Sequence, residues 1–320
     1  MPELPEVEVV RRGLAPHVLG RTVTDVDVVD HRSLRRQSGG IDRLRAVMVG
    51  ARISALARRG KFLWWRLADD RGEEIGEALV THLGMSGQLR VRGAEVIPPE
   101  APQGDFVPSI PTSEGPHPDP LRHRRITLHL DVSTRVDFVD QRLFGGLWTS
   151  DLVPTVDGLT SAWGSPDELL PHDARGIARD LLDEHLDRAS VVRILRSRRA
   201  PIKSLLLHQG IISGIGNIYA DEGLWRAAVR YDAPAARISA QRLADLLESC
   251  SLVMHEALQA GGTSFDALYV NVDGRSGYFA RSLNAYGKEG EPCPRCGTLI
   301  IREPFQNRSS FRCPRCQRHR

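Results

Sequence analysis

The sequence predicts an α+β protein in which a β-rich first half with an N-terminal helix precedes a helical domain and a small module built on cysteines. Three observations support this prediction. Short alternating or β-branched runs dominate up to about residue 140, helical spacing dominates after about residue 150, and four cysteines stand in the last thirty residues. The 320 residues suffice for two domains and such a module. We expect domains at 1–150, 166–285 and 286–320, with a linker at 151–165.

The chain begins with MPELPEVEVV, which predicts a helix over about residues 5–15. Proline and acidic residues suit the first turn of a helix, and Val7, Val10 and Leu14 recur at helical spacing. A helix start explains these residues without any chemistry. The alternative is that the first residues form the reacting end of an enzyme, and the opening stretch alone favours the structural explanation.

Alternating runs separated by polar or glycine-containing turns predict a mostly antiparallel β domain after this helix. The expected strands are 21–30, 51–57, 61–67, 77–83, 125–131 and 135–140. The segment 93–120 is rich in proline and polar residues and has no periodic apolar pattern. We therefore expect a surface insertion there.

Leu, Ile, Val and Ala recur at helical spacing in the second half of the chain, which predicts a helical domain after the linker. The expected helices are 173–185, 188–197, 202–208, 217–228 and 237–260. The last thirty residues are too few for a core of their own, so cysteine chemistry has to supply one.

Four of the five cysteines form two C-P-R-C pairs, Cys293 with Cys296 and Cys313 with Cys316, separated by sixteen residues. This spacing is typical of a four-cysteine Zn²⁺ site, although two disulfides or a redox pair are alternatives. Four thiolates leave no open position on the metal, so the expected single zinc ion is structural. Cys250 stands alone in a helical stretch and is interpreted as a small core residue.

Positive charge is concentrated in particular segments of a chain whose net charge is only +3. Between His31 and Arg66 there are ten Lys or Arg against one acid, Asp42. Such segregation suggests a face for a polyanion, although a solvated surface explains a charge run equally well. No segment approaches the roughly 20 apolar residues that a membrane helix needs, and the first residues do not form a targeting signal. We expect a cytoplasmic protein.

Five motifs in one order resemble the bacterial formamidopyrimidine-DNA glycosylases, which are also called 8-oxoguanine DNA glycosylase/AP lyases. The motifs are PELPEVE at the start, RRGKFL around Lys61, HLGMSG at 82–87, SGIGNIYADE at 213–222 and the cysteine module with its NRSSF hairpin. The related endonuclease VIII branch typically has Gly where this chain has Leu4 and lacks HLGMSG, so the chain resembles the purine-directed branch. The resemblance implies an N-terminal β-sandwich with flanking helices, then a helix–two-turn–helix domain with a four-cysteine zinc finger.

The resemblance implies that the amine of Pro2, exposed when Met1 is removed, attacks C1′ of the damaged nucleotide. An α-amino group has a pKa of about 8, so far more of it is neutral at pH 7 than of a lysine. Glu3 is implied as the acid and base, and Lys61 as a group on the neighbouring phosphate. Glu6 is expected to orient the amine, with an ordinary first-turn carboxylate as the equal alternative. The implied reaction is excision of 8-oxoguanine and formamidopyrimidines, followed by β,δ-elimination through a Schiff base.

The resemblance also implies a set of residues that bind duplex DNA containing oxidised purines. The set is Asn217, Arg308, Lys203, His82, Met85, Arg142 and Phe144. Met85, Arg142 and Phe144 are expected to fill the gap that the flipped nucleotide leaves. Many relatives have a basic residue where this chain has Leu143, so one phosphate contact is expected to be missing. Lesion recognition is expected from the segment 272–279.

The implied protein is a monomer in the cytoplasm, associated with the nucleoid and without a membrane partner. Two alternatives remain at the level of the sequence. One is a noncatalytic zinc-ribbon protein that binds DNA, which the intact Pro2, Glu3 and Lys61 argue against. The other is the pyrimidine-directed branch, which Leu4 and HLGMSG argue against.

Overall fold

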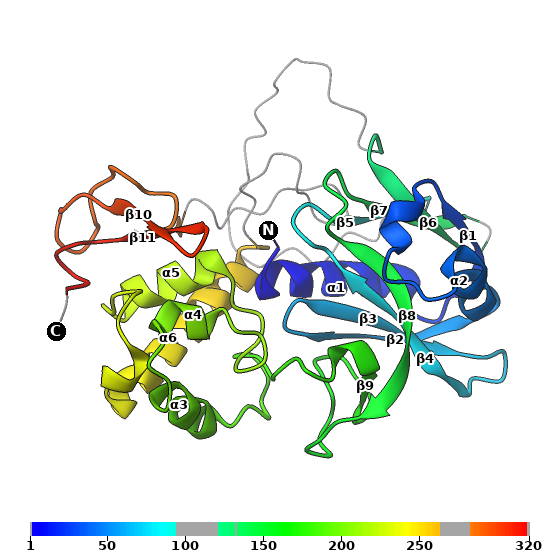
Figure 1. Ribbon diagram of the computed structural model, residues 1–320. Helices are drawn as coiled ribbons and strands as arrows, with labels where there is room; N and C mark the ends of the chain where they lie inside the picture. The colour runs from blue at the N-terminus through cyan, green and yellow to red at the C-terminus, as the bar shows by residue number, and fades with distance from the viewer. Residues whose placement is uncertain (1, 94–120, 132, 263–281, 319–320) are drawn as a thin grey trace.

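The computed structural model describes residues 2–93, 121–131, 133–262 and 282–318, and these form two lobes joined near the start of the chain (Figure 1). The β-rich lobe holds the first half of the sequence and the helical lobe the second, as predicted. Residues 94–120 of the expected insertion and the segment 272–279 lie outside the described residues.

The β-rich lobe consists of two antiparallel sheets, which confirms the predicted sandwich. One sheet has the order β1-β6-β7-β5 and the other the order β2-β3-β4-β8-β9. The first comprises β1 (Val23–Val28), β5 (Gln88–Arg92), β6 (Arg124–Leu130) and β7 (Thr134–Val139). The second comprises β2 (Arg52–Arg59), β3 (Phe62–Ala68), β4 (Glu74–His82), β8 (Gly146–Pro154) and β9 (Leu169–Pro171).

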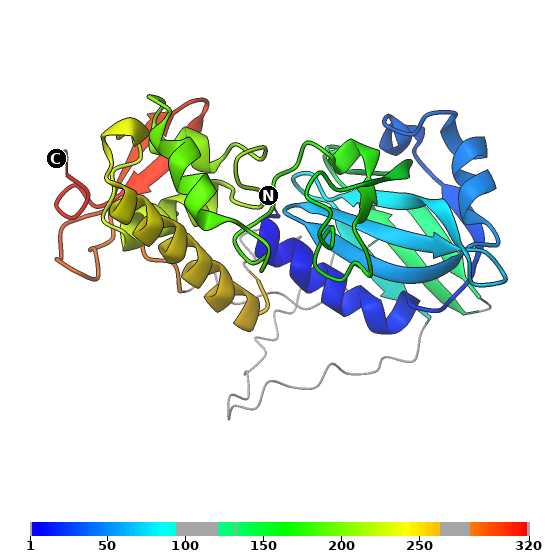
Figure 2. The same cartoon turned by 90° about the horizontal axis from the view of Figure 1, so that it is seen from below.

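Helix α1 (Leu4–Val18) runs along the sandwich and reaches the helical lobe with its first turn (Figure 2). Its buried Val7, Val10 and Leu14 join the core between the sheets, whereas Leu4 belongs to the core of the helical lobe. One helix thus enters both cores, which fixes its N-terminal turn at the junction. The 3-10 helix η1 (His31–Leu34) and α2 (Gly40–Met48) also belong to this lobe. The resemblance implied flanking helices, but local patterns did not predict where these two lie.

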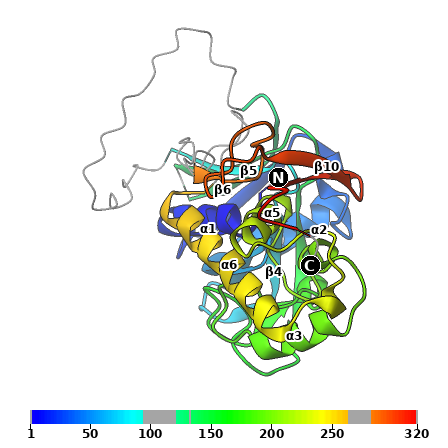
Figure 3. The ribbon, with the colours of Figure 1, turned by 90° about the vertical axis from the view of Figure 1, so that its left-hand side faces the viewer.

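The helical lobe packs around a core of leucine, isoleucine and valine side chains. Its elements are α3 (Arg188–Arg196), α4 (Ile202–Leu206), α5 (Asn217–Arg226), η3 (Ala235–Arg237) and α6 (Ala240–Gln259). Figure 3 shows α3 and the C-terminal hairpin on opposite sides of this lobe. None of the helices in the described ranges is long and apolar enough to cross a membrane.

The linker predicted at 151–165 is wrong in its first residues, because strand β8 continues through them. Strand β8 extends to Pro154, and β9 pairs with it after a loop, so the β-rich lobe extends to Pro171. The helix predicted at 173–185 is wrong as well, since only η2 (His172–Ala174) and turns precede α3. Strand β8 pairs with β4 as far as Asp151 and with β9 over residues 152–154, and local spacing does not record this pairing.

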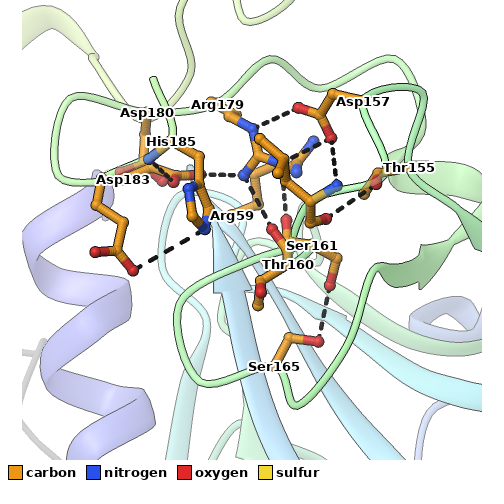
Figure 4. A network of polar contacts seen from close by, with 12 residues as sticks. Arg59, Thr155, Asp157, Thr160, Ser161, Ser165, Arg179, Asp180, Asp183 and His185 are labelled. Atoms are coloured by element: carbon orange, nitrogen blue, oxygen red, sulfur yellow. Dashed lines mark hydrogen bonds and ion pairs between the residues drawn. The ribbon is translucent and has the colours of Figure 1, made fainter. Parts of the chain in front are cut away.

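Buried arginines attach the segment after β9 to the loop between β8 and β9 (Figure 4). Arg179 donates to Asp157 and to Asp183, each at 2.8 Å, and Arg59 donates to the Ser161 carbonyl at 2.7 Å. Backbone groups of this segment also find partners outside a helix, since the Ala178 amide donates to the Gln209 carbonyl at 2.9 Å and the Ile177 carbonyl accepts from Arg59. This explains why apolar spacing at 173–185 gives turns.

The C-terminal module is a hairpin of β10 (Ile301–Phe305) and β11 (Arg308–Arg312) followed by the second cysteine pair. Gln306 and Asn307 both have left-handed backbone (φ 46° and 60°), the conformation of a two-residue hairpin turn whose twist matches the strands. The hairpin tip therefore presents Arg308 at the first position of β11.

Candidate functional site

Glu3 lies at the junction of the lobes with its side chain buried against the N-terminus of α5. Its carboxylate accepts backbone hydrogen bonds from Gly216 at 2.6 Å and Ile218 at 2.9 Å, with a longer one from Tyr219 at 3.4 Å. The first amides of a helix have no partner within the helix and carry the positive end of its dipole. The opening turn of one lobe therefore supplies the anion that the other lobe needs.

The loop before α5 approaches α1 so closely that two of its positions require glycine. A Cβ atom on Gly216 would lie 2.3 Å from Cδ of Glu3, and one on Gly214 would lie 2.5 Å from a methyl group of Leu4. Gly214 also has a backbone φ of +88°, which residues with a side chain rarely adopt. Its carbonyl oxygen accepts a hydrogen bond from the Leu4 amide at 3.1 Å. The glycines of SGIGN thus serve the contact between the lobes.

Glu6 holds the backbone next to Pro2. Its carboxylate accepts from the Glu3 amide at 2.9 Å and from the Tyr219 hydroxyl at 2.7 Å. The contact with the Glu3 amide belongs to a capping box between Glu3 and Glu6 at the start of α1, and the contact with Tyr219 links α1 to α5. Pro2 itself is buried. Both expected roles of Glu6 therefore fit its position, because the structural contact is also the one that orients the first residues.

Burial raises the pKa of the Glu3 carboxyl above its usual range, and the nearby Glu6 carboxylate adds to this effect. The Lys61 ammonium and the backbone amide of Ile218 oppose it. A carboxyl group with a raised pKa holds its proton closer to neutral pH, which suits a proton donor.

Lys61 follows a tight turn between β2 and β3 that is fixed from the other lobe. Asp180 accepts from the Gly60 amide at 2.9 Å and from Nη1 of Arg58 at 2.7 Å. Gly60 has φ +56°, and a Cβ atom there would lie 2.6 Å from the Ser213 hydroxyl. The turn therefore packs directly on the loop that leads to α5, which brings Lys61 to the junction of the lobes.

Lys61 shares its surroundings with Glu3 and Arg308. Burial and the Arg308 guanidinium lower the pKa of the Lys61 ammonium, whereas the Glu3 and Glu6 carboxylates raise it. Groups that influence one another in this way lie within electrostatic reach. The structure therefore brings residues 3, 61 and 308 together from three separate parts of the chain.

The zinc-ribbon hairpin contacts α5 and α4 through a small polar cluster. The Asn217 side-chain amide donates to the Ser309 carbonyl at 2.9 Å, and Asp221 accepts from the Phe311 amide at 3.0 Å. Lys203 is fully buried, with its ammonium 2.6 Å from Asp221 and 3.3 Å from the Ser309 carbonyl. Lys203 thus lies beside the hairpin but does not reach solvent, and its expected role in DNA binding stays a prediction.

A second group of expected residues gathers on two turns of the β-rich lobe. Met85 and Phe144 are large apolar side chains that are 41% and 52% exposed, and Nη1 of Arg142 lies 3.7 Å from the Met85 sulfur. Exposed apolar side chains that gather beside an arginine suit a surface that contacts a partner. The structure thus brings together the residues that were predicted to fill the DNA gap.

His82 ends β4 between this group and Lys61. Its ring lies 5.0 Å from the Phe62 ring, and its Nδ1 accepts from the Gly84 amide at 3.1 Å. Burial lowers the pKa of His82 to about 4, and the cations Arg36, Lys61 and Arg35 add to this. The imidazole is therefore neutral at pH 7.

The four cysteines of the two C-P-R-C pairs converge, with all their sulfur atoms within 4.8 Å of one another, and none of them is in a disulfide. Tetrahedral Zn²⁺ with Zn–S of about 2.3 Å places its sulfur ligands about 3.8 Å apart. The Sγ separations of 3.4 Å between Cys296 and Cys313 and 3.5 Å between Cys296 and Cys316 are compatible with this geometry. The residues fit one structural zinc ion, and Cys250 is buried away from them in the helical core.

Four further residues hold the elements of the site together and were not predicted from the sequence. They are Arg58, Asp180, Tyr219 and Asp221. Tyr219 and Asp221 lie in the SGIGNIYADE motif, so their motif was recognised while their contacts were not. Asp180 lies in the stretch interpreted as a helix. In the sequence, Asp180 is only a carboxylate followed by two leucines, and this pattern is too common to indicate a functional residue.

Comparisons with known proteins cover nearly the whole chain. The family descriptions that match are "Formamidopyrimidine-DNA glycosylase N-terminal domain" at 1–147, "Formamidopyrimidine-DNA glycosylase H2TH domain" at 177–268 and "Zinc finger found in FPG and IleRS" at 290–318. A formamidopyrimidine-DNA glycosylase of Mycolicibacterium smegmatis is 49% identical over 317 residues, covering 99% of this chain and 97% of the relative.

Two solved structures extend this similarity to three dimensions. The MutM (FPG) protein of Thermus thermophilus has a TM-score of 0.74 at 32% identity, covering 99% of this chain and 98% of that one. A mutant FPG of Lactococcus lactis, solved with DNA containing Fapy-dG, has a TM-score of 0.76 at 26% identity, covering 99% of this chain and 100% of that one.

Proposed function

The chain belongs to the formamidopyrimidine-DNA glycosylase family, and we propose how its residues carry out the family's reaction. It is a DNA glycosylase of base-excision repair that removes oxidised purines, in a family whose members are bifunctional glycosylase/AP lyases. The observation that carries the residue assignment is the burial of Glu3 against the N-terminus of α5, directly after Pro2.

The nucleophile in this proposal is the secondary amine of Pro2, once Met1 has been removed. Its nitrogen forms a bond to C1′ of the damaged nucleotide as the glycosidic bond breaks, and the base leaves with its electron pair. The departing base takes up the proton that the amine gives up. The bond from C1′ to the ring oxygen then breaks as that oxygen is protonated, and the nitrogen lone pair forms an iminium ion, which withdraws electrons from C2′ and makes its proton acidic. Loss of that proton expels the 3′ phosphate, and a second elimination expels the 5′ phosphate.

Glu3 moves the protons that these steps require. Its raised pKa lets it protonate the sugar ring oxygen as the ring opens, and the resulting carboxylate can accept the C2′ proton. The backbone amides of Gly216 and Ile218 hold the carboxylate in place in both states. Glu6 orients the backbone of Glu3 and therefore the amine that precedes it.

Lys61, Asn217 and Arg308 hold the phosphates on either side of the damaged nucleotide in this proposal. Lys61 and Arg308 are cations within electrostatic reach of each other at the junction of the lobes, and the Asn217 side-chain amide contacts the hairpin that carries Arg308. Contacts to neighbouring phosphates fix the backbone so that the nucleotide can rotate out of the helix. Lys203 and His82 line the same junction, and Met85, Arg142 and Phe144 fill the gap.

The partner is double-stranded DNA with oxidised purines, bound by one copy of the chain. We infer a monomer because Pro2, Glu3, Lys61, Asn217 and Arg308 all come from one chain. The proposed location is the cytoplasm, at the nucleoid.

Borohydride trapping tests the residue assignment. Wild-type protein should form a covalent adduct with duplexes that contain 8-oxoguanine or an abasic site, and react less with an oxidised pyrimidine. Absence of an adduct on every duplex contradicts the catalytic proposal, and preference for the pyrimidine contradicts the purine-directed one.

Pro2→Gly tests the nucleophile, because the variant keeps an N-terminal amine but loses the secondary amine and the fixed ring. We expect adduct formation and excision to fall by about a hundredfold or more while the thermal midpoint stays within a few degrees. If the Pro2→Gly variant is trapped as efficiently as wild type, Pro2 is not the nucleophile. Active wild-type protein whose mass still includes Met1 would lead to the same conclusion.

A further inference from the structure

The turn that carries Arg142 and Phe144 contains a strained residue. Leu143 has φ +58°, a left-handed backbone conformation that is uncommon for a residue with a side chain. Such a conformation costs about 1 kcal/mol or more and persists only where surrounding contacts hold it. The contacts that hold this turn therefore decide where Phe144 points.

Asp140 holds the amide side of the turn. Its carboxylate accepts from the amides of Arg142 at 3.1 Å and Gly145 at 2.8 Å, and from the Ser86 hydroxyl at 2.6 Å. Ser86 belongs to the turn of Met85, so Asp140 also joins the two turns. Asp140 is fully buried, which makes this half of the arrangement part of the lobe's interior.

Arg35 holds the carbonyl side of the same turn from the surface. Its guanidinium donates to the carbonyl oxygens of Leu143 and Phe144, the second at 2.7 Å. No carboxylate within ion-pair distance of Arg35 occurs in the described ranges of the chain, so its hydrogen bonds are directed to this turn. The planar guanidinium group can donate two parallel hydrogen bonds, so it suits two neighbouring carbonyl oxygens just as it suits the two oxygens of a carboxylate.

We propose that Arg35 is a positioning residue for the gap-filling group: it clamps the left-handed Leu143 so that Phe144 is presented in its inserting orientation before DNA arrives. This inference rests on the proposed function and adds a residue outside the motifs that define it. Arg35 acts through the backbone of residues 143 and 144. Preorganising an inserting side chain removes an ordering cost that would otherwise weaken each insertion.

The test compares Arg35→Met with Arg32→Met. Arg32 lies on η1, which ends directly before Arg35. It is largely exposed and pairs with Asp30, so it controls for the lost charge. Single-turnover excision of 8-oxoguanine should fall about tenfold or more in the Arg35 variant, because an intact base has to leave the stack. Cleavage at a preformed abasic site should stay within about twofold, because that nucleotide leaves the stack more easily. Arg32→Met should stay within about twofold on both.

Leu143→Gly in the Arg35→Met background supplies the rescue. Glycine adopts φ near +60° without a steric penalty, so the turn no longer needs the clamp and excision should recover most of its rate. The proposal is overturned if Arg35→Met and Arg32→Met excise 8-oxoguanine equally well. It is also overturned if Arg35→Met loses as much activity on the abasic site as on 8-oxoguanine, or if Leu143→Gly restores no activity. Wild-type protein that neither excises nor forms an adduct overturns the proposed function instead, so the two failures are distinguishable.

Discussion

The two ends of the chain attach to opposite ends of the same helix, α5, and they do so in different ways. At its N-terminus, Glu3 accepts backbone hydrogen bonds from Gly216 and Ile218. At its C-terminus, Arg295 of the zinc ribbon donates to the carbonyls of Trp225 and Arg226 at 2.8 and 2.7 Å. An anion at the first turn and a cation at the last both match the helix dipole.

The difference lies in what keeps each attachment in place. Glu3 is buried and is followed by Leu4, which is part of the helical core, so the first attachment is a product of ordinary packing. The Arg295 guanidinium stacks 4.0 Å from the Trp225 ring, and the small cluster of apolar side chains in this module includes all four cysteines. We infer that the catalytic end is held by packing, whereas the DNA-clamping end depends on the metal.

Zinc removal should separate the two attachments most clearly. Cys296→Ser should lose the metal and unfold the ribbon, since binding of a structural zinc supplies about 10–16 kcal/mol to such modules. Hydrogen exchange should show the Phe311 amide unprotected and the Ile218 amide still protected. Cys250→Ala is the control and should retain one zinc per chain. Loss of protection at Ile218 would show that the two attachments are one cooperative unit.

Acid should weaken the N-terminal attachment through Glu8. Hydrogen bonds from Arg11 and the charge of Arg58 lower the pKa of Glu8 to about 2 from an ordinary 4.5, despite burial. A lowered pKa stabilises the fold above pH 4.5, and this contribution disappears as the pH falls from 4.5 to 2. Urea unfolding at pH 7 should show Glu8→Gln about 3 kcal/mol less stable than wild type. A difference that stays constant down to pH 2 would contradict this account.

Gly216→Ala should disturb the catalytic end without unfolding it. The added Cβ would lie 2.3 Å from Cδ of Glu3, so the carboxylate has to move. A shift of a catalytic group by about 1 Å can reduce a catalytic rate by about a hundredfold. Gly176→Ala is the matched control because nothing lies within 4 Å of its Cβ position. Equal single-turnover rates for the two variants would mean that the Glu3 contacts do not position the reacting groups.

Arg308→Ala should give the smallest effect, on binding alone. Loss of one phosphate contact should weaken DNA binding about tenfold and reduce the slope of log K against log salt by about 1. Arg315→Ala removes the same charge at the second cysteine pair and serves as the control. An unchanged salt slope for Arg308→Ala would exclude its role as a phosphate clamp.

Much of the fold could be predicted from local patterns because its elements are locally encoded. The spacing of Val7, Val10 and Leu14 predicted α1, and alternation predicted most strands of the sandwich. Predictions were wrong where partners decide: β9 is three residues long and exists because β8 lies beside it. The segment 173–185 has helical spacing, but its Arg179 side chain donates to Asp157 in the loop between β8 and β9, and its Ala178 amide donates to the Gln209 carbonyl.

Local sequence was enough to predict the zinc ligands, because the two-residue spacing within each cysteine pair lets both thiolates bind one metal ion. The reacting groups Pro2 and Glu3 were implied by the resemblance of whole motifs, and their roles stay a proposal. Only the tertiary structure shows which residues surround these groups and hydrogen-bond to them. The Glu3 carboxylate and the Gly216 amide are 213 residues apart in the chain, and Arg35 and Leu143 are 108 apart. Burial and hydrogen bonds between such distant residues set pKa values and orientations, and no local pattern contains them.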